Sequence, residues 1–213
     1  MSTKIIMIRH GYSISNNLKI FTGQSDIALA ELGREQARLC GEFFIGKKGI
    51  DAIYSSDLSR AYDTAIEVGK ALSLEVIRDS QLREIFAGEW EMMPFCEIEK
   101  KYPEEYSVWK NDVGRATPTG GESVADMAKR VERAVCRIAE KHDGGEVVIA
   151  THATPIRVIC TLSQGLDIAD MGKVPWVSNA SISAFEFDGK FTLIDKNITS
   201  HLGSLKTDLP RGV

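Results

Sequence analysis

The stretch that decides the fold is KIIMIRHGYSISNN, residues 4–17. Its first six residues form a short, almost wholly apolar run rich in isoleucine, which is typical of a strand buried on both faces of a parallel sheet. The run stops at Arg9 and His10, and Gly11 and small polar residues follow. Polar groups at the end of a buried strand cost free energy unless they have partners. The pair therefore indicates a chemical role at that strand end.

The rest of the chain predicts helices and strands in alternation. Helices are expected at 31–49, 57–72, 120–145 and 153–165, and strands at 51–56, within 74–85 and at 146–151. Asp57 is predicted to cap the second of these helices, and Ser123 to start the third. The alternating segment 180–197 predicts a hairpin that turns at Asp188 and Gly189. This order favours an α/β fold with a largely parallel sheet.

Residues 86–121 follow a different pattern, with three prolines and two tryptophans. They predict short helices laid over the core, so the chain is interpreted as one domain, 1–213, with a cap inserted at 86–121. Four aromatic residues of this segment are expected to form an apolar lid or, as the favoured interpretation, some of them the core of the cap: Trp90, Phe95, Tyr102 and Trp109. The C-terminal stretch LKTDLPRGV (205–213) is expected to be poorly ordered.

Composition excludes several classes of function. A formal net charge of −4 argues against nucleic acid as the main partner, although it leaves room for a local cationic pocket. The apolar N-terminal run is too short for a signal peptide, and no stretch approaches the ~18 apolar residues of a membrane span. The four cysteines form no CxxC pair, so neither a zinc nor a redox motif is supported. Cys40, Cys136 and Cys160 are expected to be buried free thiols, as suits a cytoplasmic protein.

The polar residues that follow the strands form a constellation. Ligands of open α/β sheets bind beyond the carboxyl ends of the strands. The predicted strand ends carry Arg9-His10, then Ser55-Ser56 with Arg60 one helical turn later, then Arg83-Glu84, and finally Thr151-His152. Each residue alone is a weak signal, since a single histidine or arginine is more often structural or solvated. Two of the four histidines at two strand ends are a stronger one.

These residue types fit phosphoryl transfer through histidine. A neutral imidazole is a good nucleophile toward phosphorus. Arginines bind phosphoryl oxygens with two donors at a time, and the charge of the transition state is spread over those oxygens. A carboxylic acid can then protonate the leaving alkoxide and later take a proton from water.

Six motifs also resemble those of the histidine phosphatase superfamily, or phosphoglycerate mutase-like family. They are spread along most of the chain: IRHGYSISN (8–16), FTGQSDIALAELGREQA (21–37), IYSSDLSRAYDTA (53–65), LREIFAGEWE (82–91), PTGGES (118–123) and ATHATPIR (150–157). The resemblance implies a three-layer α/β/α sandwich with a mostly parallel sheet, of the phosphoglycerate mutase-like kind, and a small helical cap.

The resemblance also implies a role for each matching residue. His10 is the nucleophile that becomes phosphohistidine, Glu84 is the proton donor, and His152 contacts the phosphoryl group as a charged donor. Arg9 and Arg60 hold its oxygens. Asn16 helps to hold the phosphate, and three residues line the substrate side: Ser13, Thr22 and Gly23. Gly11 is expected to let a phosphoryl group approach the backbone. Tyr12 departs from the family, which usually has Glu, Gln or Thr there.

The compact segment 86–121 resembles the phosphatase branch of the family, including its alpha-ribazole phosphatase-like and broad-specificity members. Mutases of the family have a longer, arginine-rich insertion. The basic residues of this segment are interpreted as solvated charges: Lys100, Lys101, Lys110 and Arg115. The resemblance therefore predicts a metal-independent phosphomonoesterase of the histidine acid phosphatase type. It would need no cofactor, would act on a small phosphorylated metabolite and would be a monomer or homodimer.

Other readings stay open or are excluded. A cofactor-dependent phosphoglycerate mutase is the main alternative, and a non-catalytic phosphate-binding regulatory domain is a weaker one. A cysteine-dependent phosphatase is excluded because no cysteine is followed by Arg in a Cys-x5-Arg pattern. GEFFIGKK (41–48) lacks the Ser or Thr of a P-loop, and a serine hydrolase would lack its Gly-x-Ser-x-Gly elbow.

Overall fold

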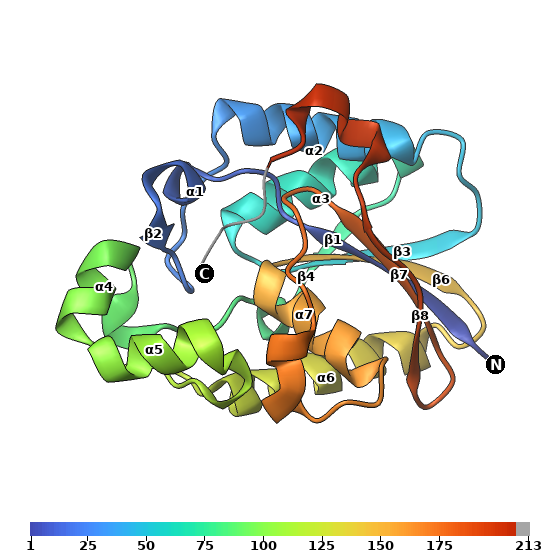
Figure 1. Ribbon diagram of the computed structural model, residues 1–213. Helices are drawn as coiled ribbons and strands as arrows, with labels where there is room; N and C mark the ends of the chain where they lie inside the picture. The colour runs from blue at the N-terminus through green and yellow to red at the C-terminus, as the bar shows by residue number, and fades with distance from the viewer. Residues whose placement is uncertain (208–213) are drawn as a thin grey trace.

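The structure, a computed structural model, describes residues 1–207 and is built on a central sheet (Figure 1). Within these residues the sheet has six strands, in the order β4 (Val76–Arg78), β3 (Ile50–Ser55), β6 (Glu146–Thr151), β1 (Thr3–Arg9), β7 (Ile182–Phe187) and β8 (Phe191–Ile198). Residues 208–213, most of the C-terminal stretch expected to be poorly ordered, lie outside the described residues.

The sheet is mostly parallel, as predicted. Strands β4, β3, β6 and β1 pair in parallel. Strand β7 runs antiparallel to β1, and β8 runs antiparallel to β7. The last two strands form the predicted hairpin, and Gly189 at its turn adopts a φ of +98° that favours glycine.

Helices cover both faces of the sheet, which confirms the three-layer sandwich. Helices α2 (Glu31–Phe43) and α3 (Ser59–Leu72) lie over one face, and α6 (Val124–Lys141) and α7 (Ala153–Leu162) over the other (Figure 1). Side chains of β1 alternate between the two cores, because successive residues of a strand point to opposite faces. Ile6 and Ile8 pack in the cluster of α2 and α3, whereas Ile5 and Met7 pack in that of α6 and α7. This alternation explains why nearly every residue of the strand is apolar.

The helix boundaries confirm one predicted cap and correct another. Ser123 caps α6, because its hydroxyl oxygen accepts the Asp126 N–H at 3.1 Å. Asp57 does not cap α3, since Leu58 takes the N-cap position and leaves Asp57 one residue too early. The carboxylate of Asp26 instead accepts the Ser59 N–H at 2.7 Å. Asp57 pairs with Arg83, each carboxylate oxygen accepting one N–H at 2.6 Å.

Short elements surround the end of the sheet where the parallel strands finish. Helices α4 (Phe95–Lys101) and α5 (Pro103–Asn111) confirm the short helices predicted between 86 and 121. Strand β5 (Met93–Pro94) pairs with β2 (Ile20–Phe21), which follows α1 (Ile14–Leu18) and ties this segment to the loop after β1. The 3-10 helices of the described chain are η1 (Ser80–Leu82), η2 (Gly88–Trp90), η3 (Val113–Arg115), η4 (Ile168–Lys173) and η5 (Ser200–Leu205).

Burial confirms some expectations for individual residues and corrects one. Trp90, Tyr102 and Trp109 are buried in the main core cluster, as interpreted for a cap core. Cys40 and Cys160 are buried free thiols, but Cys136 is only partly buried, because it sits at the edge of the apolar stripe of α6. None of the helices within residues 1–207 has the length and apolar character needed to cross a bilayer.

Candidate active site

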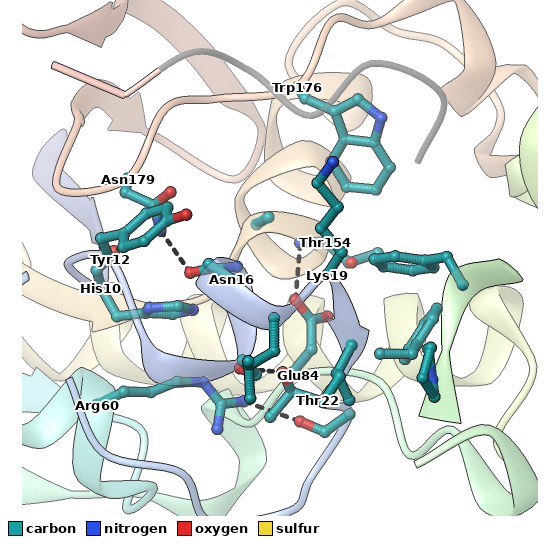
Figure 2. Close-up of a pocket in the computed structure, with 18 of the residues that line it drawn as sticks. His10, Tyr12, Asn16, Lys19, Thr22, Arg60, Glu84, Thr154, Trp176 and Asn179 are labelled. Atoms are coloured by element: carbon teal, nitrogen blue, oxygen red, sulfur yellow. Dashed lines mark hydrogen bonds between the residues drawn. The ribbon is translucent and has the colours of Figure 1, made fainter. Parts of the chain in front are cut away.

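The ends of β1, β3 and β6 bring the two strand-end histidines, His10 and His152, together. The His10 N–H donates to the Thr151 carbonyl at 3.0 Å, and the Ser56 N–H donates to the Ala150 carbonyl at 2.9 Å. The rings of His10 and His152 lie edge to face with centroids 5.2 Å apart. A cavity of about 700 Å³ opens here, and Arg9, His10, Arg60 and Glu84 are among its lining residues (Figure 2).

His10 is held as a neutral imidazole with one nitrogen available. Its Nδ1 lies 2.7 Å from the Gly11 carbonyl oxygen, and because a carbonyl only accepts, Nδ1 carries the proton. The Nε2 lone pair is then the nucleophilic position. Burial, followed by the charges of Arg60 and Arg9, lowers the pKa of His10 well below its ordinary value. The free base is therefore the form that the surroundings favour.

His152 is also favoured in its neutral form. Burial is the main cause that lowers its pKa, and the charges of Arg60, His10 and Arg9 act in the same direction. Its Nε2 forms a hydrogen bond with the Ser56 hydroxyl at 2.8 Å, in which the tautomer decides the donor, while Nδ1 is buried with no partner within residues 1–207. Burial, and then the positive charges around it, therefore favour a neutral His152, and the charged donor that the resemblance implies stays a prediction.

Arg9, at the end of β1, and Arg60, in the first turn of α3, both line the cavity. The Arg9 guanidinium donates through Nη1 to the Val177 carbonyl at 2.5 Å, and its Nε has no partner in the described chain. Arg60 donates to the carbonyls of Gly23 and Ser25 at 2.8 and 2.9 Å. Burial lowers the pKa of each to about 10, partly opposed by the charge of Glu84. Both arginines therefore stay charged at neutral pH.

Glu84 reaches the same end of the cavity from the loop after β4. Its carboxylate accepts the Ile85 N–H at 2.9 Å and the Thr154 N–H, at the start of α7, at 3.3 Å. Figure 2 shows the second of these bonds. Arg130 of α6 supports the loop from behind by donating to the carbonyls of Gln81, Arg83 and Glu84 at 2.8, 3.1 and 3.2 Å. Arg83, also considered from the sequence, does not line the cavity because Asp57 binds it.

Two glycines allow the loop after His10 to pass close to α2. A Cβ on Gly11 would meet the Gly33 carbonyl oxygen at 2.4 Å, and one on Gly33 would meet the Tyr12 carbonyl oxygen at 1.9 Å. Gln36, fully buried, accepts the Tyr12 N–H at 2.8 Å. Gly11 thus serves the close approach of two backbones. Its expected role in letting a phosphoryl group approach the backbone stays a prediction.

Asn16 lines the cavity, whereas Ser13 does not. The Asn16 Oδ1 accepts from the Ser13 N–H at 3.0 Å, from the Ser13 hydroxyl at 2.9 Å and from the Asn179 amide at 3.2 Å. Its amide nitrogen is therefore the donor left for a ligand. Ser13 is buried as the N-cap of α1, because its hydroxyl serves this capping box. The expected contact of Ser13 with substrate is thus replaced by a supporting role.

The remaining lining includes residues that the sequence did not indicate. Thr22 and Gly23 line the cavity, as expected, and the Thr22 hydroxyl donates to Ser15. Tyr12 lines it too. The residues that sequence reasoning missed are mostly aromatic or polar members of irregular segments: Leu18, Lys19, Tyr106, Thr154, Trp176 and Asn179. Trp176 and Asn179 lie between η4 and β7, where no periodicity marks them.

The basic side chains of the cap lie outside the cavity. Lys101 pairs with Glu89, Lys110 with Glu99, and Arg115 with Asp112. Lys100 is exposed. These positions confirm the interpretation as solvated charges. Within residues 1–207 no three His, Cys, Asp or Glu side chains are arranged to hold a metal ion.

Comparison with known proteins agrees with this geometry. The family described as histidine phosphatase superfamily (branch 1) matches residues 5–198. Phosphoserine phosphatase 1 of Hydrogenobacter thermophilus is 32% identical over 211 residues, 99% of each chain. A mycobacterial glucosyl-3-phosphoglycerate phosphatase, solved with VO3, is 31% identical with a TM-score of 0.84, covering 92% of this chain and 99% of that one. The alpha-ribazole phosphatase from Shigella flexneri is 28% identical with a TM-score of 0.81, covering 92% and 96%.

Proposed function

This chain belongs to the histidine phosphatase superfamily and is a phosphatase of small phosphorylated metabolites, and we propose that it works through a phosphohistidine formed on His10. One observation carries the proposal. The Nε2 lone pair of a buried, neutral His10 faces a site where two charged arginines and a fixed carboxyl group converge. That set supplies a nucleophile, a cradle for phosphoryl oxygens and a proton donor.

In the first step Nε2 of His10 attacks phosphorus, and the bond from phosphorus to the alcohol oxygen breaks. The alcohol oxygen takes a proton from the Glu84 carboxylic acid and leaves as a neutral alcohol. Arg9, Arg60 and the amide nitrogen of Asn16 hold the phosphoryl oxygens. The Arg9 Nε–H, which has no partner in the described chain, supports this assignment because a phosphoryl oxygen would satisfy it.

In the second step water attacks the phosphohistidine. The Glu84 carboxylate takes a proton from the water, the bond from Nε2 to phosphorus breaks, and inorganic phosphate leaves. His10 returns to its neutral form, and Glu84 is again protonated. His152 completes the site through its neutral N–H. No step requires a metal ion, and we propose that the enzyme is metal-independent and needs no other cofactor.

The cavity also bears on the mutase alternative. A mutase must hold a second acidic group of its substrate and therefore needs further cationic donors. Apart from Arg9 and Arg60, Lys19 is the only cation among the described residues that line the cavity. The relatives compared include a phosphoglycerate mutase-like protein of Arabidopsis thaliana by name, but the lining favours hydrolysis.

The assignment of domains, location and assembly belongs to the same proposal. We infer one domain over 1–213 with 86–121 as its cap, since β5 of that segment pairs with β2. From the sequence we also propose that the protein is cytoplasmic and is a monomer or a homodimer. Light scattering during size-exclusion chromatography would decide between the two states.

The test compares two activities of the purified enzyme in chelator. Hydrolysis of para-nitrophenyl phosphate is measured beside conversion of 3-phosphoglycerate primed with its bisphosphate. The proposal predicts hydrolysis that survives the chelator and disappears in His10→Ala, with His142→Ala as the control outside the site. Efficient mutase turnover with negligible hydrolysis would show that the alternative is right. Substantial hydrolysis by His10→Ala would contradict the assignment of His10 as the nucleophile.

A further inference from the structure

The cavity is much larger than the cluster that would hold a phosphoryl group, and its two ends differ in chemistry. The inner end holds Arg9, Arg60 and Glu84, which lie close enough for the charge of Glu84 to oppose in part the lowering of both arginine pKa values by burial. The outer part is lined mainly by aromatic and aliphatic side chains: Leu18, Phe21, Phe95, Tyr106, Trp109 and Trp176. A volume of about 700 Å³ leaves this outer part free for the alcohol portion of a substrate.

The aromatic wall is held rigid. The Arg157 guanidinium lies 4.2 Å from the centre of the Trp176 ring, and it is fixed in turn by donating to the Val174 carbonyl at 2.6 Å. The rings of Trp176 and Trp109 are tilted by 34° with centroids 6.5 Å apart. Trp109 packs edge to face on Phe21 at 5.0 Å. A planar group that enters the cavity therefore meets an ordered surface and orders few side chains on binding.

Charge limits what the outer part can accept. Among the described residues that line the cavity, Lys19 is the only charged one beyond the inner three. A strongly charged or zwitterionic alcohol portion would lose its hydration there and leave most of its charges unpaired. An aromatic or heteroaromatic group loses little hydration and gains stacking and apolar contact.

We propose that the outer cavity is a subsite for a planar, largely apolar group on the alcohol portion of the substrate. The preferred substrates are then phosphomonoesters of aromatic or heteroaromatic alcohols, with the phosphoryl group at the inner end and the ring against Trp176 and Phe95. The proposal rests on the proposed function, since the phosphoryl group must bind at His10 for the ring to reach this wall.

The test uses substrates whose leaving groups have the same reactivity. Propyl phosphate and 3-phenylpropyl phosphate both release a primary alkyl alcohol, so a difference in kcat/KM reports binding of the ring. O-phospho-L-serine is the charged counterpart. We expect kcat/KM for the phenylpropyl ester to exceed that for each of the other two esters by about tenfold or more, because stacking on an aromatic side chain contributes about this much in other binding sites.

Variants locate the preference. Trp176→Leu and Phe95→Ala should each lower the ratio of kcat/KM for the phenylpropyl ester to kcat/KM for the propyl ester severalfold, because each removes an aromatic ring face. Trp176→Leu keeps an apolar side chain at this position but removes the aromatic face, so it tests stacking. Phe43→Ala is the matched control, since Phe43 is a partly buried phenylalanine of α2 outside the cavity. It should leave the ratio unchanged.

The outcomes separate this inference from the proposed function. Equal kcat/KM for the two esters, or a preference for O-phospho-L-serine, would overturn the aromatic subsite while hydrolysis itself stands. An unchanged ratio in both variants would also overturn it. Failure of the wild-type enzyme to hydrolyse any of the three esters would contradict the proposed function instead.

Discussion

The two ends of the cavity are built in different ways. The inner end is charged, and its side chains come from the last residue of β1, the residue that follows it, the loop after β4 and the first turn of α3. Hydrogen bonds to backbone groups fix these side chains. The outer end is aromatic, and its side chains come from α1, β2, α4, α5 and the segment between η4 and β7. There, side-chain packing determines position.

This difference separates chemistry from specificity. The inner end depends on the sheet, which must stay folded for the site to exist. The outer end depends on short elements that can change without moving the sheet. Substitutions at the inner end should therefore affect every substrate, whereas those at the outer end should affect substrates unequally.

The largest contrast is expected from Glu84→Gln. Without the acid, kcat for alkyl phosphates should fall about 10²–10⁴-fold, because the leaving alkoxide is no longer protonated. For para-nitrophenyl phosphate the first step needs little acid help, so a burst of nitrophenol should precede slow hydrolysis of the phosphoenzyme. Stopped-flow absorbance measures both phases. An equal loss for the two leaving groups, with no burst, would contradict the role of Glu84.

A second expected effect concerns stability at acid pH. The folded pKa of His10 and of His152 is lowered, chiefly by burial, so between the folded pKa and about 6.5 the unfolded chain binds more protons. Stability is thus full above about pH 6.5 and falls as pH drops below it, by up to about 1.4 kcal/mol per pH unit for each histidine. Urea unfolding of the wild type and of a His10→Asn, His152→Asn double variant between pH 5 and 7.5 measures the slope.

The double variant should flatten that slope, while His201, whose pKa is also lowered by burial, keeps part of it in both proteins. Identical slopes for the two proteins would show that the buried imidazoles do not set the acid limit.

A smaller effect is expected from Arg130→Lys. Lysine keeps the charge but cannot donate to three carbonyls and pair with Glu122 at once, so the Glu84 loop should lose its position. We expect kcat for alkyl phosphates to fall about tenfold and para-nitrophenyl phosphate to be affected less, as for Glu84→Gln. Arg133→Lys on the same helix is the control, since the exposed Arg133 side chain donates to the Lys129 carbonyl of its own helix. An equal loss for both esters would indicate general destabilisation.

The smallest effect should be confined to the outer end. Cys96 is exposed at the cavity rim, whereas Cys40 and Cys160 are buried, so a bulky maleimide should react first at Cys96. The adduct should lower the ratio of the phenylpropyl to the propyl ester by a few-fold, because it narrows the apolar wall. Steady-state kinetics of the labelled enzyme measure the ratio, with labelled Cys96→Ser as control. A ratio that stays constant would place Cys96 away from the ring of the substrate.

The same division decides what the sequence could predict. Arg9, His10, Glu84 and His152 each follow a strand or its loop, so the topology alone predicts that they converge. Arg60 follows from the same rule one helical turn later. Parallel strands were recognisable because burial on both faces of the sheet requires a continuous apolar run. Ile5 and Ile6, neighbours in β1, pack in the cores on opposite faces of the sheet.

The sequence was least informative where a side chain has a partner that its local pattern does not indicate. Asp57 looks like a cap in sequence, but the nearby Arg83 binds it and Asp26 caps the helix instead. Ser13 matches a substrate-contacting position, yet its hydroxyl serves the turn of α1. Trp176 was missed because it lies in an irregular segment and is held by Arg157 from another element.

The central claim is that His10 carries the phosphoryl group. Rapid-quench mixing of wild-type enzyme with ³²P-labelled 3-phenylpropyl phosphate, followed by digestion, tests it most directly. The account predicts a label that is stable in base and labile in acid, located on the peptide containing His10 and absent in His10→Ala. A label on another residue, or unlabelled enzyme during rapid turnover of the wild type, would contradict it.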